Sequence, residues 1–137
     1  MTKRTLGSLT AAVFILSSSA WAQGTASKEP VSDGRTLTQW VADLKAAAPQ
    51  TRNAAAYEIS GMGPAAAAAV PALIVALDDP EASVRFPVTV ALGEIGPAAK
   101  DAIPRLKKMM DEEINDEIAA AAKRALRRIQ PQAVSGE

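Results

Sequence analysis

The sequence predicts an all-α fold in which helix pairs stack in a row as an α-solenoid. The first observation is a repeat, because residues 52–73 and 85–106 carry matching residues 33 positions apart. Such a period is typical of units that cannot bury their apolar faces alone. The second is composition: 48% of the chain is hydrophobic, but only 4% is aromatic. Small and aliphatic side chains predict closely packed helices.

The repeat rests on four matched positions. These are Arg52 with Arg85, Gly63-Pro64 with Gly96-Pro97, Val70-Pro71 with Ile103-Pro104, and Leu73 with Leu106. Extending the pattern in both directions gives about three helix pairs over residues 36–130.

The N-terminal residues 1–22 have the three parts of a bacterial secretory signal. Lys3 and Arg4 precede a short apolar run, and Ala20-Trp21-Ala22 offers a cleavage site. The run is shorter than the roughly 20 residues of a membrane-spanning helix, so an uncleaved anchor is the less favoured alternative. We therefore expect a periplasmic or secreted protein with no membrane span after cleavage.

A polar tract, residues 23–35, follows the signal and is predicted to be a disordered linker. The first helix is expected at 36–47, where Thr36 and Gln39 have the spacing of a capping box. Pro49 is expected to end that helix, and the next is predicted at 51–60.

In the second unit, residues 65–69 predict a tight helical turn and residues 71–77 a helix that begins at a proline. Asp79 is a candidate N-cap for a helix over 80–95. Pro87 lies inside that helix and predicts a kink.

The third unit predicts a helix over 104–110, an acidic turn at 111–113 and a final helix over 116–129. Residues 131–137 are expected to form a flexible tail. Alignment by the repeat predicts three core layers. They are Leu37, Val70 and Ile103; Trp40, Leu73 and Leu106; and Leu44, Leu77 and Met110.

The residue inventory excludes several kinds of site. The chain has no cysteine and no histidine, which removes thiol and imidazole catalysis and most transition-metal ligand sets. No cofactor is therefore expected. Net charge is zero, and removing Lys3 and Arg4 with the signal leaves 13 basic against 15 acidic residues. No overall field favours nucleic acid.

The repeat strings resemble HEAT-like repeats of the phycobilisome-lyase type over residues 36–129. The strings are Val84-Arg85, Ala91-Leu92-Gly93-Glu94-Ile95-Gly96-Pro97 and Ala102-Ile103-Pro104 with Leu106, and one unit earlier Gly61-Met62-Gly63-Pro64, Ala69-Val70-Pro71-Ala72-Leu73 and Leu77-Asp78-Asp79-Pro80. The resemblance implies a right-handed solenoid whose second helices line the concave face.

The resemblance also implies a tie between units, made by an aspartate in the inter-unit turn and an arginine early in the next helix. Asp79 and Arg85 match this pattern. Ala46 replaces the aspartate at the preceding junction, and Ala119 replaces the arginine at the last one. Deoxyhypusine hydroxylases resemble this architecture, but their histidine ligands have no counterpart here.

The helices around Leu73 and Leu106 predict a partner site in the groove. Ile74 and Val75 would supply an apolar patch flanked by basic residues, suited to a peptide with an apolar anchor and an acidic neighbour. The basic residues are Arg105, Lys107 and Lys108. The alternative is that these lysines are merely solvated.

Two other groups of charged residues have competing interpretations. The basic residues of the last helix can be interpreted as an anion or nucleic-acid patch, but complementarity with the helix dipole already explains their position. They are Lys123, Arg124, Arg127 and Arg128. Glu58 and Glu94 could form a carboxylate pair, but their 36-residue separation breaks the repeat phase.

These observations favour an exported, non-enzymatic scaffold that binds a protein or peptide on its concave face. An accessory or regulatory subunit of an exported enzyme is the alternative, and a hydrolase that uses carboxylates alone is a third hypothesis. Three units are few for a solenoid, so self-association through a terminal repeat is also predicted.

Overall fold

The computed structural model describes residues 28–134; the predicted signal and residues 23–27 and 135–137 lie outside this range. Within it, three pairs of α-helices follow a short β-hairpin. The helices are α1 (Leu37–Asp43), α2 (Pro49–Met62), α3 (Val70–Ala76), α4 (Ala82–Ile95), α5 (Ile103–Glu112) and α6 (Asp116–Ile129). The 3₁₀ segments are η1 (Gly63–Ala69), η2 (Gly96–Ala102) and η3 (Pro131–Val134).

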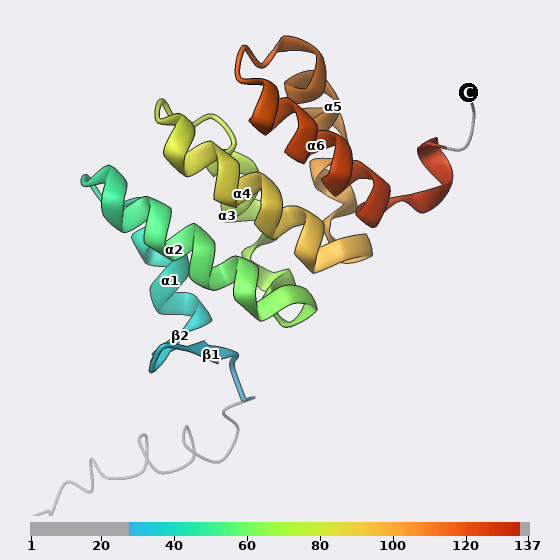
Figure 1. Ribbon diagram of the computed structural model, residues 1–137. Helices are drawn as coiled ribbons and strands as arrows, with labels where there is room; N and C mark the ends of the chain where they lie inside the picture. The colour runs from blue at the N-terminus through green and yellow to red at the C-terminus, as the bar shows by residue number, and fades with distance from the viewer. Residues whose placement is uncertain (1–27, 135–137) are drawn as a thin grey trace, which may run out of the picture.

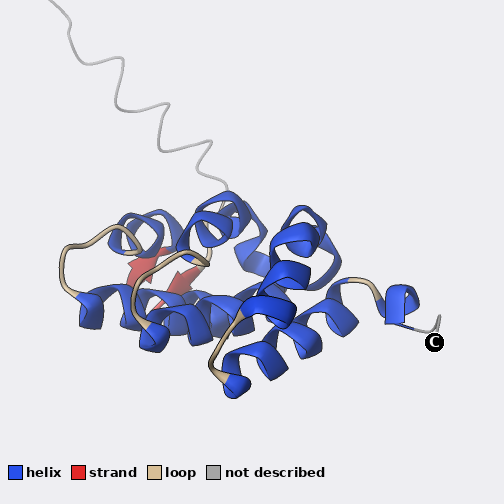
Figure 2. Ribbon diagram, turned by 90° about the horizontal axis from the view of Figure 1, so that it is seen from above, coloured by secondary structure: helices blue, strands red, loops and turns tan. Residues whose placement is uncertain are grey.

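The helices form two layers, with α2, α4 and α6 side by side in one and α1, α3 and α5 in the other (Figures 1 and 2). Each helix of the second layer packs on its neighbour in the first, and one contiguous hydrophobic core runs between the layers. This arrangement confirms the predicted all-α solenoid.

The two layers are not packed equally. The most extensive helix contacts join α2 to α4 and α4 to α6, whereas α1, α3 and α5 make few contacts with one another. We call the exposed surface of the closely packed helices α2, α4 and α6 the inner face. The placement of the concave binding face on the helices around Leu73 and Leu106 stays a prediction.

The predicted core layers are largely correct, since Trp40, Leu73, Leu77 and Leu106 are all buried. The exceptions are Ile103, which is only partly buried, and Met110, which is exposed while its neighbour Met109 is buried. Helix α3 ends at Ala76 and its C-cap Leu77 is buried, but α5 continues to Glu112. Residue 110 therefore stays on the outside of its helix.

The predicted tight turn is confirmed, because η1 and its counterpart η2 are 3₁₀ segments in equivalent places. Each begins at a glycine with positive φ, 55° at Gly63 and 78° at Gly96. Backbone in this region favours glycine, since it has no Cβ to clash. Pro64 and Pro97 follow at the start of each segment.

Three helix starts test the predicted signals. Thr36 and Gln39 form the expected capping box at the start of α1. Pro49 does not end a helix but begins α2, where its missing N–H is not needed. The N-cap of α4 is Glu81 rather than Asp79, whose Oδ1 instead accepts the Glu81 N–H at 3.0 Å.

The end of the predicted linker is ordered, so a disordered linker is wrong for residues 31–35. Strands β1 (Val31–Ser32) and β2 (Arg35–Thr36) pair as an antiparallel hairpin. The turn residues Asp33 and Gly34 both have positive φ, as tight hairpin turns require. The carbonyl of Ser32 accepts the Trp40 Nε1–H at 3.0 Å, so the hairpin covers the first helix pair.

One apolar stretch, Pro49–Ala76, has the composition of a membrane span, with a hydropathy of 1.7. It contains α2, η1 and α3 and changes direction at Gly63, whose φ is 55°. The longest straight part, α2, has 14 residues and is about 21 Å long. This is shorter than the roughly 30 Å hydrocarbon core of a bilayer.

Candidate functional site

An arginine clamp joins the first helix pair to the second. Arg52 binds Asp79 with two nitrogens, at 2.6 Å through Nε and 3.0 Å through Nη2. Its third nitrogen donates to the carbonyls of Ala46 and Ala47, both at 2.9 Å. The guanidinium therefore provides donors for two backbone carbonyls after α1 and binds the carboxylate of the loop before α4.

A second clamp repeats this geometry one unit later. Arg85 binds both carboxylate oxygens of Glu113 at 3.0 Å and donates to the carbonyls of Asp79 and Pro80 at 2.9 and 3.0 Å. Fork-to-fork binding of this kind is directional as well as strong. The side chains in both clamps are mostly buried.

Asp79 and Arg85 both lie at the junctions, but their side chains do not pair with each other. The Asp79 carboxylate reaches back to Arg52, and Arg85 takes the Asp79 carbonyl and the Glu113 carboxylate. Hydrogen bonds from Arg52 lower the pKa of Asp79, and hydrogen bonds from Arg85 lower the pKa of Glu113. Both carboxylates are thus used in holding the stack.

Pro87 is accommodated without interrupting α4. A proline leaves the carbonyl four residues earlier without its helical donor, and that carbonyl belongs to Ser83. The Asn53 side-chain amide on α2 donates to it. The helix therefore runs continuously from Ala82 to Ile95, with the ring of Pro87 buried in the core.

The predicted partner residues lie on the α3 and α5 layer, outside the inner face. Val75 is 70% exposed, whereas Ile74 is half-buried against the core. Arg105 pairs with Asp78, and Lys108 lies 3.7 Å from Glu112. The nearby hollow of about 310 Å³ is lined by three cations and four carboxylates. The charged surface at this hollow is therefore not basic overall.

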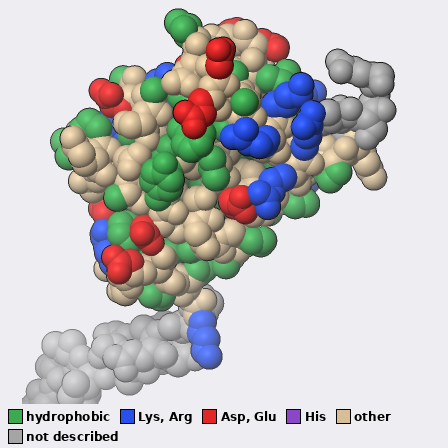
Figure 3. All heavy atoms as spheres, viewed as in Figure 1, with side chains coloured by type: hydrophobic (Ala, Val, Ile, Leu, Met, Phe, Trp, Pro, Cys, Tyr) green, Lys and Arg blue, Asp and Glu red, His purple; other side chains and the backbone are tan. Residues whose placement is uncertain are grey.

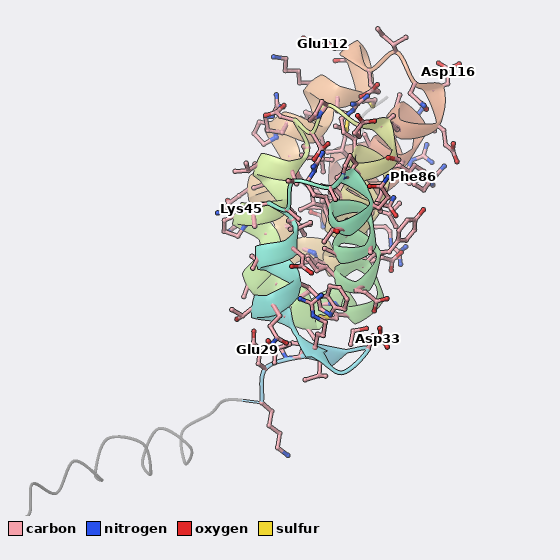
Figure 4. All side chains as sticks on the ribbon, turned by 90° about the vertical axis from the view of Figure 1, so that its left-hand side faces the viewer. Glu29, Asp33, Lys45, Phe86, Glu112 and Asp116 are labelled. Atoms are coloured by element: carbon pink, nitrogen blue, oxygen red, sulfur yellow. The ribbon has the colours of Figure 1, made fainter. Side chains whose placement is uncertain are left out.

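The inner face carries an apolar patch that sequence reasoning missed. Figure 3 looks onto α2, α4 and α6 and shows hydrophobic side chains gathered over their middle. The apolar patch consists of Tyr57 on α2, which is 52% exposed, and Phe86 and Val90 on α4, both half-buried. Figure 4 shows Phe86 on the opposite side of the stack from Lys45.

Beside the patch lies an arginine hollow of about 280 Å³ between α4 and α6. It is lined by Val90, Gly93, Glu94, Ala121, Arg124, Ala125, Arg127 and Arg128. The floor is low because a Cβ at Gly93 would lie only 3.0 Å from the Ala125 Cα. Lys and Arg side chains gather over this part of the face in Figure 3.

The other candidate chemistry is not assembled. Glu58 accepts from the Ser32 hydroxyl at 2.5 Å and Glu94 pairs with Arg128 at 2.5 Å, so each carboxylate has its own partner on a different element. Among residues 28–134 no group of three or more acidic side chains could hold a metal ion.

The repeated clamp, the repeated 3₁₀ turn and the two layers describe one unit occurring in series. A family model described as HEAT repeats matches residues 37–127. The chain belongs to the HEAT repeat family. No curated protein and no solved structure matches it. The phycobilisome-lyase subtype and the right hand of this HEAT solenoid stay predictions.

HEAT repeats generally mediate protein–protein interaction, which directs attention to the exposed faces. The signal for the apolar patch was present in the sequence. Repeat alignment makes Phe86 of α4 equivalent to Asn53 of α2, and Val90 equivalent to Tyr57. In a chain with so few aromatic residues, an aromatic residue on an exposed helix face indicates a binding surface. Which layer is the more closely packed could not be found this way, because both helices of a pair have apolar stripes.

Proposed function

We propose that this HEAT-repeat chain is a non-catalytic protein-binding module whose partner docks on the inner face formed by α2, α4 and α6. The observation that carries the proposal is the exposure of Tyr57 on that face. Aromatic side chains are enriched at the centres of protein interfaces, where they bury a large area for little conformational entropy. Phe86 and Val90 extend the same surface onto the next helix.

The opposite layer supports docking less well. Its exposed aliphatic residue, Val75, is next to charged pairs that already satisfy each other, such as Arg105 with Asp78. A partner would have to break these pairs or leave them at the edge of the interface. A partner that covers Tyr57 on the inner face would not have to break such an ion pair.

Site-specific photocrosslinking tests which face docks. A benzophenone amino acid at position 57 should form a protein adduct in extract of the native host, whereas the same group at position 75 should form none. Tyr57→Ser with Phe86→Ser, combined with a crosslinker at position 90, should reduce the adduct. Adducts from position 75 but not from position 57 would reject the inner face as the docking surface.

We also propose that the module acts after export. The support is the sequence of residues 1–22, with its basic start, apolar run and small-residue cleavage site. Expression in a bacterial host followed by fractionation should recover the chain from the periplasm or medium with Gln23 as its first residue. Recovery from the cytoplasm with residues 1–22 intact would reject export.

A further inference from the structure

The cationic end of α6 carries more free positive charge than its structural role needs. Favourable interaction with the helix dipole is confined to the last turn, which contains Arg127 and Arg128. Lys123 and Arg124 lie before that turn. Among residues 28–134 the only ion pair to this group joins Arg128 to Glu94. Lys123, Arg124 and Arg127 therefore have no carboxylate partner there.

These cations also repel one another. Arg124 and Arg128 are four residues apart on the helix, as are Lys123 and Arg127. Like charges at this spacing destabilise a helix by a few tenths of a kcal/mol per pair. No acidic residue lies one turn before Arg124 or Arg127, since those positions are Ala120 and Lys123. An anionic partner would remove this repulsion.

The arginine hollow gives such a partner a place to bind. Arg124, Arg127 and Arg128 rise around a floor formed by Gly93, Ala121 and Ala125, where apolar surface predominates. A carboxylate could pair with a guanidinium while its methylene groups rest on the floor. Guanidinium groups suit this role, because their planar fork binds carboxylates with two hydrogen bonds.

The hollow is continuous with the apolar patch, because Val90 belongs to both. Phe86 lies one helical turn before Val90 on α4. An occupant seated in the hollow would therefore meet apolar surface on one side and arginines on the other. This combination fits a chain that carries acidic and apolar side chains close together.

We propose that the arginine hollow and the apolar patch together recognise an acidic protein segment with an apolar anchor residue, glutamate or aspartate facing Arg124 and Arg127. This inference rests on the proposed function and names the chemistry of the partner. A nucleic acid fits less well, because Asp116 and Glu117 begin the same helix and confine the positive charge to its second half. A nucleic-acid backbone needs cations along several phosphates.

Fluorescence anisotropy with the full chain tests the inference. The probe is a labelled peptide with four glutamates around one phenylalanine, and a second probe replaces each glutamate with glutamine. The double variant Arg124→Glu/Arg127→Glu should bind the glutamate peptide at least about tenfold more weakly. The glutamine peptide should bind the native chain more weakly, and added salt should weaken the glutamate complex.

The matched control is Lys107→Glu/Lys108→Glu, which changes net charge by the same amount on the opposite layer. It should leave affinity within about twofold. Equal losses in both double variants, equal affinity for both peptides, or no binding of the glutamate peptide would overturn the proposal. So would tighter binding of a single-stranded oligonucleotide of the same charge. Circular dichroism and thermal melting of each variant separate lost binding from lost folding.

The photocrosslinking experiment separates this inference from the proposed function. An adduct at position 57 that survives Arg124→Glu/Arg127→Glu would keep the inner face and reject the acidic chemistry of the partner. Absence of that adduct in the native sequence would reject the docking face itself.

Discussion

The two junctions between successive helix pairs use the same arginine clamp but bring their inner helices together differently. Between α2 and α4 the contact includes a polar bond, from the Asn53 amide to the Ser83 carbonyl. Between α4 and α6 the helices approach until Gly93 lies against Ala125. The Asn53 bond lies beside the clamp at the starts of its two helices, whereas Gly93 and Ala125 meet in the later parts of theirs. Local side chains thus add to the clamp at a different place in each junction.

The arginine clamp accepts either an aspartate or a glutamate as its carboxylate. Arg52 binds an aspartate 27 residues later, and Arg85 binds a glutamate 28 residues later. Each carboxylate also accepts the backbone N–H two residues further on, from Glu81 and Asn115 respectively. The longer side chain of Glu113 thus serves at a different offset, and the repeat needs the carboxylate rather than its exact position.

The largest difference between the junctions should appear on substitution of Gly93. Gly93→Val places branched carbons against the Ala125 backbone, where only helix separation can relieve the contact. We expect a loss of about 3 kcal/mol in the free energy of unfolding, measured by urea denaturation. Ser60→Val at the equivalent place in α2 should cost less than about 1 kcal/mol. Equal costs would show that the two crossings are alike.

Removal of a clamp should have the next largest effect. Arg85→Ala leaves Glu113 without its ion-pair partner and two carbonyls without their donor, so we expect a loss of about 2 kcal/mol in urea denaturation. Arg85→Lys should recover only a minor part, because an ammonium cannot reproduce the fork. Arg52→Ala should act in the same direction at the first junction.

The matched control for the clamp is Arg105→Ala, which removes a more exposed pair with Asp78. Pairs of this kind contribute little, and we expect a change within about 0.5 kcal/mol. If Arg105→Ala cost as much as Arg85→Ala, charge rather than the clamp geometry would be responsible.

The sequence predicts only those features of the junctions that recur at the repeat spacing. The 33-residue repeat by itself makes Arg52 and Arg85 equivalent. It does not identify Glu113, because α5 is longer than α3 and its partner carboxylate falls out of phase. The repeat also does not predict which layer of helices packs more closely, since the spacing between helices depends on the volumes of the side chains between them.

The N-terminal hairpin was missed for a different reason. Asp33-Gly34 is a strong turn signal, but the strands on either side have only two residues each. Strands this short are stabilised by what they cover, here Trp40 and α2, rather than by their own alternation of residues. Apolar helical stripes, by contrast, are local, which is why the six helices were placed nearly correctly within residues 36–130.

Acid should weaken both clamps together. The pKa values of Asp79 and Glu113 are lowered in the fold by their arginines, from ordinary values of 3.8 and 4.5. A lowered folded pKa means that the stabilisation is fully present above the ordinary value and is lost as pH falls through the folded one. The thermal midpoint should therefore decrease between about pH 5 and pH 2.

The neutral variant Asp79→Asn/Glu113→Gln is the control for this titration. It should melt at a lower temperature at pH 7 and show a flatter dependence on pH below 5. Some slope should persist, because hydrogen bonds from Thr38 also lower the pKa of Glu29. An unchanged slope would assign the acid sensitivity to groups outside the clamps.

The smallest effect concerns the polar bond of the first junction. Asn53→Ala leaves the Ser83 carbonyl without a donor because Pro87 has no N–H, and the expected loss is about 1 kcal/mol in urea denaturation. In a Pro87→Ala background, residue 87 regains an N–H that can bond to Ser83, so the same Asn53 substitution should cost less. A double-mutant cycle measures this difference as a coupling of roughly 0.5 kcal/mol or more. Strict additivity of the two substitutions would mean that the amide bond forms without compensating for the proline, and that the first junction depends on its clamp and packing alone.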